Sequence, residues 1–314
     1  MAKVKRRKLK TKNIIKLSVI ICLLIIVIVG INTIKYKNSD KYKLKEIGYN
    51  NNQIREILNL EKEYKKKVLS TDYNEFLLAL FKEEYFKFDN VDRYLDYHKK
   101  DEKETPKNVV AITNVGSDYE RYTNTNETDA HKDILMLVNK YNYLSKNYKP
   151  EKIVDVKNWY CYGEAQLRED VYDAFITMFN AAKKEDITLI INSGYRDYED
   201  QDSTYQSFYE SYGEDEADKI AARPGFSEHQ TGLSLDLTSY DETENNVFEN
   251  TNDFKWLQDN AYKYGFILRY PKGKEKITGY DYESWHYRYV GIEVATKIKN
   301  LGITFDEYYE YFIK

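Results

Sequence analysis

A long apolar segment near the start of the chain most restricts how this protein can fold. Residues 17–31, LSVIICLLIIVIVGI, carry no charge, and three isoleucines extend the segment at its edges: Ile14, Ile15 and Ile34. The resulting length of about 21 residues matches the ~20 that a helix needs to span a bilayer. We therefore predict a transmembrane helix at residues 14–35, preceded by a basic tail at residues 1–13.

The residues beside this segment predict its orientation. The tail is rich in Lys and Arg, and such positive flanks stay in the cytoplasm. The bulk of the chain is therefore expected outside it, in a single-pass protein of the cell membrane. A cleaved signal peptide is the main alternative, although no small-residue cleavage site follows the apolar core. A lipoprotein is less favoured, because Cys22 lies inside the apolar run and not after it.

Composition excludes several other classes of protein. The net charge of -4 gives no electrostatic basis for binding nucleic acid. The two cysteines, Cys22 and Cys161, cannot form a disulfide framework, because Cys22 belongs to the apolar segment. The 32 tyrosines are spread along the whole chain, which indicates a compositional bias rather than a binding role.

The rest of the chain divides into a spacer and a mixed domain. Residues 36–105 have apolar residues at helical spacing and end in a charged stretch that runs into Pro106, a pattern typical of a linker. Residues 106–314 mix strands and helices without regular alternation, which favours an α+β fold over a doubly wound sheet. Strands are predicted at 108–116, 187–193, 232–239, 265–270 and 282–291, and helices at 164–186 and 252–264.

The segment SEHQTGLSLDLTS, residues 227–239, holds the first candidate metal ligands. Its leucines alternate with Ser234, Asp236 and Thr238, so a strand places Asp236 on the face opposite the leucines. His229 precedes the strand across a turn, from which the chain can fold it back toward Asp236. Taken alone, this pair is more typical of a solvated aspartate and a hydrogen-bonded histidine than of a metal site.

The segment YESWHYRYVG, residues 282–291, completes a ligand set. Zinc commonly takes three protein ligands and keeps a fourth position open, and imidazole and carboxylate are suitable donors. His229, Asp236 and His286 would make that set for one zinc ion per chain. Glu283 is then the spare carboxylate that general-base catalysis requires. An ordinary strand with packed aromatics is the alternative, but it does not explain why Glu283 and His286 are placed together.

A third segment, ITLIINSGYR, reads as a buried strand that ends in a glycine turn. It delivers Arg196 to the end of the strand, where a guanidinium can bind a carboxylate or a developing oxyanion. A single arginine after a strand is more often a surface residue.

Together, the three segments resemble the zinc D-alanyl-D-alanine carboxypeptidases of the VanY type, a group related to VanX-type dipeptidases and to the Hedgehog-like zinc fold. The resemblance rests on S-G-Y-R-x4-Q from residue 193, S-x-H-x6-D from residue 227 and E-x-W-H from residue 283. Their order and spacing match the family, and the resemblance covers roughly residues 106–310. The apolar segment and the spacer lie outside it.

The resemblance implies the zinc ligands and the base named above, and it adds further roles. Arg196 would stabilise the carbonyl oxygen as it gains charge, while Ser227 and Gln201 would contact the substrate near its terminal residue. The implied domain has a small antiparallel sheet flanked by helices. The implied substrate is the peptidoglycan stem peptide, from which the enzyme would remove the terminal D-Ala.

Three alternatives stay open at this point. The same zinc centre would serve an L,D-carboxypeptidase acting on trimmed stems, or an endopeptidase of stem peptides. A wall-binding or regulatory module could keep the fold without turnover. A structural membrane protein whose spacer is the functional part has no feature in its favour.

Overall fold

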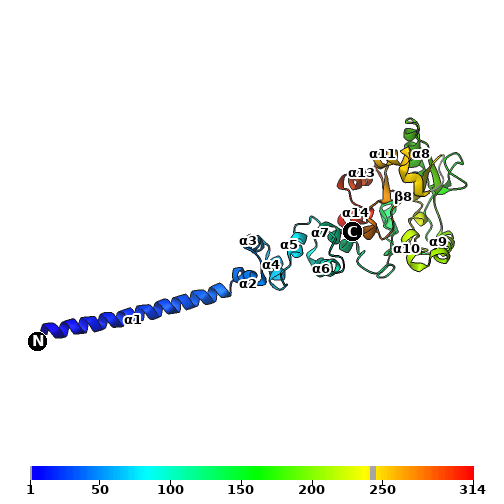
Figure 1. The fold of residues 1–314 in the computed structure, drawn as a ribbon. Coiled ribbons are helices and arrows are strands. Elements are labelled where there is room, and N and C mark those ends of the chain that lie inside the picture. Colours follow the sequence, from blue (N-terminus) through cyan, green and yellow to red (C-terminus); the bar gives the residue numbers. More distant parts are fainter. Residues whose placement is uncertain (1, 241–244) are drawn as a thin grey trace. The chain divides into compact units, whose positions relative to one another are not determined.

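In the computed structural model, which describes residues 2–240 and 245–314, the apolar segment lies in helix α1 (Ala2–Lys37) (Figure 1). The portion Thr11–Lys37 is long and apolar enough to cross a membrane, and it is the one such helix in the described part of the chain. A signal sequence at the N-terminus satisfies the same criterion. The helix therefore agrees with the predicted anchor without excluding cleavage.

The described residues form two compact units, one reaching to Lys82 and one spanning Glu83–Lys314. After α1, the first unit contains α2 (Asp40–Ile47), α3 (Asn51–Asn59), α4 (Lys62–Leu69) and α5 (Glu75–Leu80). The α-helices of the second unit are α6 (Val91–Lys100), α7 (Pro106–Val115), α8 (Glu169–Lys183), α9 (Tyr198–Tyr212), α10 (Glu214–Ile220), α11 (Asn252–Asn260), α12 (Glu275–Thr278), α13 (Ile292–Leu301) and α14 (Phe305–Phe312). Its 3-10 helices are η1 (Phe88–Asn90), η2 (Ala130–Leu135), η3 (Glu228–Thr231), η4 (Asn245–Asn250) and η5 (Ala261–Tyr264). Its strands are β1 (Asn126–Glu127), β2 (Asn142–Tyr143), β3 (Ile153–Asp155), β4 (Gln166–Arg168), β5 (Leu189–Ser193), β6 (Ser234–Ser239), β7 (Phe266–Tyr270) and β8 (Glu283–Tyr289).

The first unit follows the predicted helical pattern. Helix α2 ends at Gly48, whose φ of 117° is accessible mainly to glycine, and Asn50 then caps α3 by accepting hydrogen bonds from two backbone amides. Ile54 and Ile57, three residues apart on α3, are both buried. The sequence GYNNN therefore separates α2 from α3.

Residues 83–105 belong to the larger unit, whereas the sequence analysis assigned them to the spacer. In helix α6, Tyr94 is fully buried. The charged stretch after α6 also binds to the larger unit, because Lys276 Nζ lies 2.6 Å from carboxylate oxygens of Asp101 and Glu104. These partners are distant in sequence, so the composition of the stretch alone resembled that of a linker.

A fragment that begins at Glu83 is therefore expected to be more stable than one that begins at residue 106. The shorter fragment lacks α6 and exposes the surface that Tyr94 covers. Since burial of one large apolar side chain contributes about 1.5–3 kcal/mol, the shorter fragment should lose at least that much and melt several degrees lower. Thermal unfolding of both purified fragments, followed by circular dichroism, measures the difference. Equal melting temperatures would show that residues 83–105 do not belong to the domain.

The stretch NVVAITNVG lies in helix α7, so the strand predicted there is wrong. Thr105 caps the helix by accepting a hydrogen bond from the Asn108 amide, Pro106 opens its first turn, and Gly116 ends it with a φ of 85°. Every residue from Val109 to Asn114 is buried. A helix enclosed on all sides has no polar face, so its sequence resembled a buried strand.

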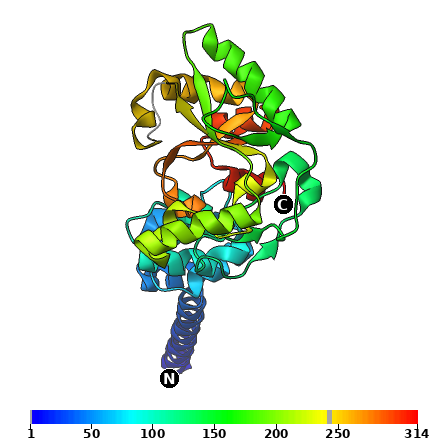
Figure 2. The same cartoon turned by 90° about the vertical axis from the view of Figure 1, so that its right-hand side faces the viewer.

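The main sheet is antiparallel, with the strand order β5-β6-β8-β7. The central strand β6 carries the predicted alternation: Leu233, Leu235 and Leu237 are fully buried in the hydrophobic core. Residues of α8 and α11, including Phe175 and Leu257, pack in the same core, and both helices lie along this side of the sheet (Figures 1 and 2). The small antiparallel sheet flanked by helices is therefore confirmed, and its opposite face is left for polar side chains.

Candidate metal centre and active site

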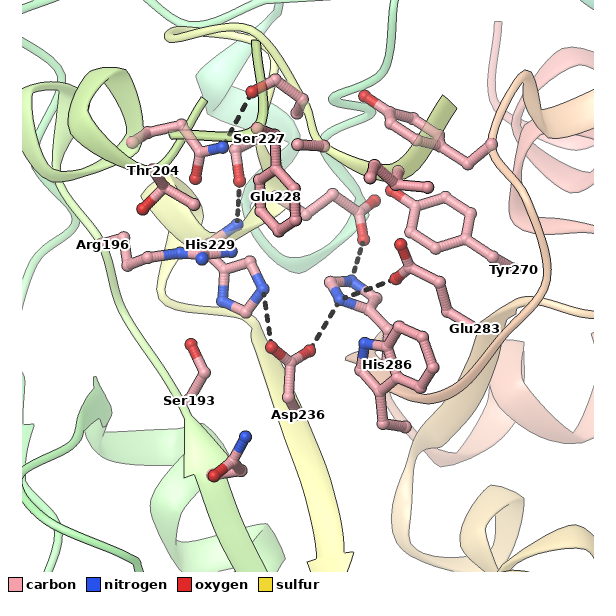
Figure 3. Close-up of a pocket in the computed structure, with 18 residues that line it drawn as sticks. Ser193, Arg196, Thr204, Ser227, Glu228, His229, Asp236, Tyr270, Glu283 and His286 are labelled. Atoms are coloured by element: carbon pink, nitrogen blue, oxygen red, sulfur yellow. Dashed lines mark hydrogen bonds and ion pairs between the residues drawn. The ribbon is translucent and has the colours of Figure 1, made fainter. Parts of the chain in front are cut away.

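Three side chains from two distant segments of the sequence meet on the polar face of the sheet (Figure 3). His229, Asp236 and His286 are buried, and each offers one ligand atom within 4.8 Å of the others. Nε2 of His229 lies 3.5 Å from one carboxylate oxygen of Asp236. Nδ1 of His286 lies 3.0 Å from the other. The aspartate therefore lies between two imidazoles in a geometry that can surround one ion.

Strand register and a close backbone approach hold these groups in place. Asp236 and His286 are directly opposite each other on β6 and β8, so both side chains emerge on one face. His229 Nδ1 lies 2.6 Å from the carbonyl oxygen of Gly194. Because that oxygen only accepts, Nδ1 carries the proton, and Nε2 is left free for a metal. Gly194 must be glycine, since a Cβ there would lie 2.3 Å from the Gln166 carbonyl oxygen.

Glu283 reaches the same cavity because β8 is irregular. In a regular strand, residues three apart point to opposite faces, so Glu283 and His286 would be separated. Glu283 and Tyr287 are four residues apart on β8, whereas their partners Tyr270 and Leu268 are two apart on β7. This bulge turns Glu283 back toward the metal ligands, and its Oε2 lies 3.8 Å from His286 Nδ1.

Burial and neighbouring charges together set the protonation of the four groups. Burial dominates for Glu283 and His229. It raises the pKa of Glu283 to about 7, which suits a group that takes up and gives back a proton near neutral pH. It lowers the pKa of His229, which favours the neutral ring that binds metals. Burial opposes the charged forms of Asp236 and His286, but neighbouring groups outweigh it: His229 and His286 lower the pKa of Asp236, and Asp236 and Glu228 raise that of His286 to about 9.

The remaining predicted site residues line one cavity of about 350 Å³ together with these groups. Arg196 follows β5, and its Nε has no hydrogen-bond partner among the described residues. Gln201, on α9, donates its amide to the Ala222 carbonyl oxygen at 2.8 Å, while its own Oε1 has no partner in the described part of the chain. Ser227 accepts a hydrogen bond from the His229 amide at 3.3 Å. Unsatisfied donors and acceptors thus face a space of ligand size.

The sequence analysis missed several residues that line the cavity, among them Glu228, Tyr270 and Tyr280. Glu228 is buried between Ser227 and His229, and its place directly before a candidate ligand was the available signal for it. Tyr270 packs against His286 with 5.0 Å between ring centroids. The tyrosines gave no signal, because the chain has 32 of them.

The cluster suits a zinc ion. Two imidazoles and one carboxylate are a common donor set for catalytic zinc, and all three side chains line the cavity, so substrate can reach the metal position. Each histidine turns one nitrogen to the cluster and the other toward a protein oxygen, as zinc ligands commonly do.

Comparisons with known proteins find carboxypeptidases. The VanY family of D-alanyl-D-alanine carboxypeptidases matches residues 164–292. The presumed carboxypeptidase YodJ of Bacillus subtilis (strain 168) is 45% identical over 185 residues, which are 57% of this chain and 68% of YodJ. A D-alanyl-D-alanine carboxypeptidase of Enterococcus faecium is 32% identical over 241 residues, which are 74% of this chain and 72% of that protein.

A solved structure shows the same fold. The LD-carboxypeptidase LdcB is 43% identical, with a TM-score of 0.56. The match covers 61% of this chain and 92% of that one.

Proposed function

Because the chain belongs to the VanY family of D-alanyl-D-alanine carboxypeptidases, we propose that it removes the terminal D-Ala from peptidoglycan stem peptides. The chain is a zinc metallopeptidase with one zinc ion per chain, and we assign the zinc to His229, Asp236 and His286. The convergence of these three side chains beside Glu283 in one cavity is the observation that carries the proposal.

Glu283 acts as the general base in this proposal. Bound zinc would polarise the scissile carbonyl and activate water as the nucleophile. Glu283 takes the proton of the attacking water and passes it to the departing amine, so that free D-Ala leaves. A pKa near 7 lets one carboxyl group do both, and a cation beside Glu283 would favour its charged, basic form before the attack.

The neighbouring polar groups bind and orient the substrate. Arg196 stabilises the oxygen of the attacked carbonyl as its negative charge grows, and its unpaired Nε supports a role toward a ligand. Ser227, before η3, and Gln201, on α9, both line the cavity and contact the substrate near its terminal residue. These groups select a peptide end and hold its carbonyl at the metal.

The location of the substrate agrees with an extracytoplasmic active site. We propose that α1 anchors the chain in the cell membrane as a single-pass helix, with the basic residues at its start in the cytoplasm. The catalytic domain then lies on the side of the membrane where peptidoglycan is found.

An L,D-carboxypeptidase is the second candidate. The observation in its favour is the 43% identity to LdcB, an LD-carboxypeptidase. Both activities use the same zinc centre and base, and they differ in which stem residue precedes the bond that is cut.

Product analysis on defined stem peptides tests the function. The full-length chain in detergent is expected to release one D-Ala from a pentapeptide stem ending in D-Ala-D-Ala, to lose this activity with a zinc chelator, and to regain it when zinc is restored. Mass spectrometry of the products identifies the bond. Cleavage of a tetrapeptide stem alone would indicate the L,D-activity, and cleavage of a cross-linked stem an endopeptidase. A zinc-loaded chain that cleaves none of them would be a wall-binding module.

A further inference from the structure

A buried carboxylate that the proposed mechanism does not use lies behind His286 (Figure 3). Glu228 belongs to η3, and its side chain is fully buried. One oxygen, Oε2, lies 3.5 Å from Nε2 of His286, on the side of the ring away from Asp236. The other, Oε1, accepts hydrogen bonds of 2.8 Å from Arg269 and Arg288.

The facing atoms of Glu228 and His286 have no better partner. Neither Glu228 Oε2 nor His286 Nε2 has a hydrogen-bond partner among the described residues. A buried polar group without a partner is costly, and a 3.5 Å separation becomes a hydrogen bond with a shift of about half an ångström. The pair is therefore placed to form one hydrogen bond, in which Nε2–H of His286 donates to Oε2 of Glu228.

A rigid ionic frame holds Glu228 in this place. Arg269 also donates to Asp306 at 2.5 Å, and Arg288 donates to the main-chain oxygen of Met136 at 2.8 Å. Two carboxylates thus balance two guanidinium groups, and all four side chains are buried. Glu228 is held directly by the two arginines, from β7 and β8, whereas Asp306 on α14 binds only the other nitrogens of Arg269. Glu228 therefore cannot turn away from His286 without leaving buried charge unpaired.

We propose that Glu228 is the positioning residue for His286 as a zinc ligand. By accepting the proton on Nε2, it selects the tautomer in which Nδ1 has a free lone pair, and Nδ1 is the atom that faces Asp236. The negative charge behind the ring also makes Nδ1 a stronger donor. The inference rests on the proposed function, because it assigns a role relative to the same zinc ion.

Two matched variants of the full-length chain in detergent test this role. Glu228→Gln removes the charge that faces His286. Asp306→Asn removes the other carboxylate that binds Arg269, so it leaves a similar buried excess of positive charge without touching His286. The zinc affinity of each protein is measured by competition with a chelator, and the visible absorption spectrum of the Co(II)-substituted protein reports the ligand environment.

Glu228→Gln is expected to weaken zinc binding about 10–100-fold and to shift the Co(II) spectrum. Asp306→Asn should change zinc affinity less than about threefold and keep the wild-type spectrum, even if it lowers the melting temperature as much as Glu228→Gln does. Equal losses of affinity in both variants, or wild-type affinity in Glu228→Gln, would overturn the proposal. A wild-type chain that binds no zinc would instead overturn the proposed function.

A second variant covers the case in which Glu228→Gln does not fold. Glu228→Asp keeps the negative charge beside the two arginines but withdraws the carboxylate from His286 by one methylene length. It is expected to fold and still to bind zinc more weakly than wild type. Wild-type affinity and an unchanged Co(II) spectrum in this variant would contradict the proposal.

Discussion

Glu283→Gln is expected to reduce D-Ala release about 10²–10⁴-fold while the protein keeps its zinc. Glutamine has the shape of glutamate but cannot accept a proton from the attacking water. The three proposed ligands are untouched, so one zinc per chain should remain. The turnover number on a pentapeptide stem and the metal content of the same sample provide the measurement. A variant that cleaves at the wild-type rate would refute the assignment of the base.

Glu307→Gln is the matched control for this loss. Glu307 is also buried, but it caps α14 and pairs with Lys274 outside the cavity. Its replacement should lower stability and leave the turnover number almost unchanged. A large loss of activity in this control would mean that any buried carboxylate gives the same effect through folding.

The raised pKa of Glu283 also predicts how the stability of the metal-free chain depends on pH. Its pKa of about 7 in the folded protein lies above the ordinary value of 4.5, so the folded state binds more protons between these pH values. Stability that Glu283 provides at low pH is therefore lost as pH rises from 4.5 to 7. Glu283→Gln should not show this loss, and at pH 8 it should be more stable than wild type by roughly 1–3 kcal/mol. Urea unfolding at pH 5 and pH 8 measures the difference.

His229→Ala is expected to remove zinc and activity together. The variant loses one of the three proposed protein ligands. Zinc content should fall from about one per chain to nearly none, and D-Ala release should fall to the assay background. Zinc added at a hundred times its Kd should stabilise the wild-type protein by about 2.7 kcal/mol and so raise its melting temperature. The variant should show no such rise.

His131→Ala is the control for the ligand variant. His131 lies in η2 and is exposed, and it does not line the cavity. This variant should keep zinc, turnover and the zinc-dependent rise in melting temperature. If His229→Ala still carried one zinc per chain, the proposed ligand set would be wrong.

The residues of the candidate site could be predicted because each motif combines side chains of suitable chemistry with a local sequence pattern. Leucines alternating along β6 place Asp236 on the polar face in any antiparallel sheet, so this part of the geometry follows from residue types alone. Three such motifs in one order then indicated the family, which the comparisons confirm.

Errors arose where burial or distant partners decide the structure. Helix α7 was predicted as a strand because its burial on every side removes the polar face on which a helical pattern depends. The charged stretch after α6 looked like a linker because Lys276, which binds Asp101 and Glu104, lies far along the chain. No local pattern contains that information.

The sequence by itself determined the apolar N-terminal helix, the α+β domain and the identity of the groups that can hold zinc, because these depend on composition, periodicity and residue chemistry. The tertiary structure alone decided how those groups meet. The bulge in β8 turns Glu283 toward the ligands, and the carbonyl of Gly194 leaves Nε2 of His229 free. The ionic frame around Glu228 depends on four elements that are distant in sequence, and only folding brings their charges within bonding distance.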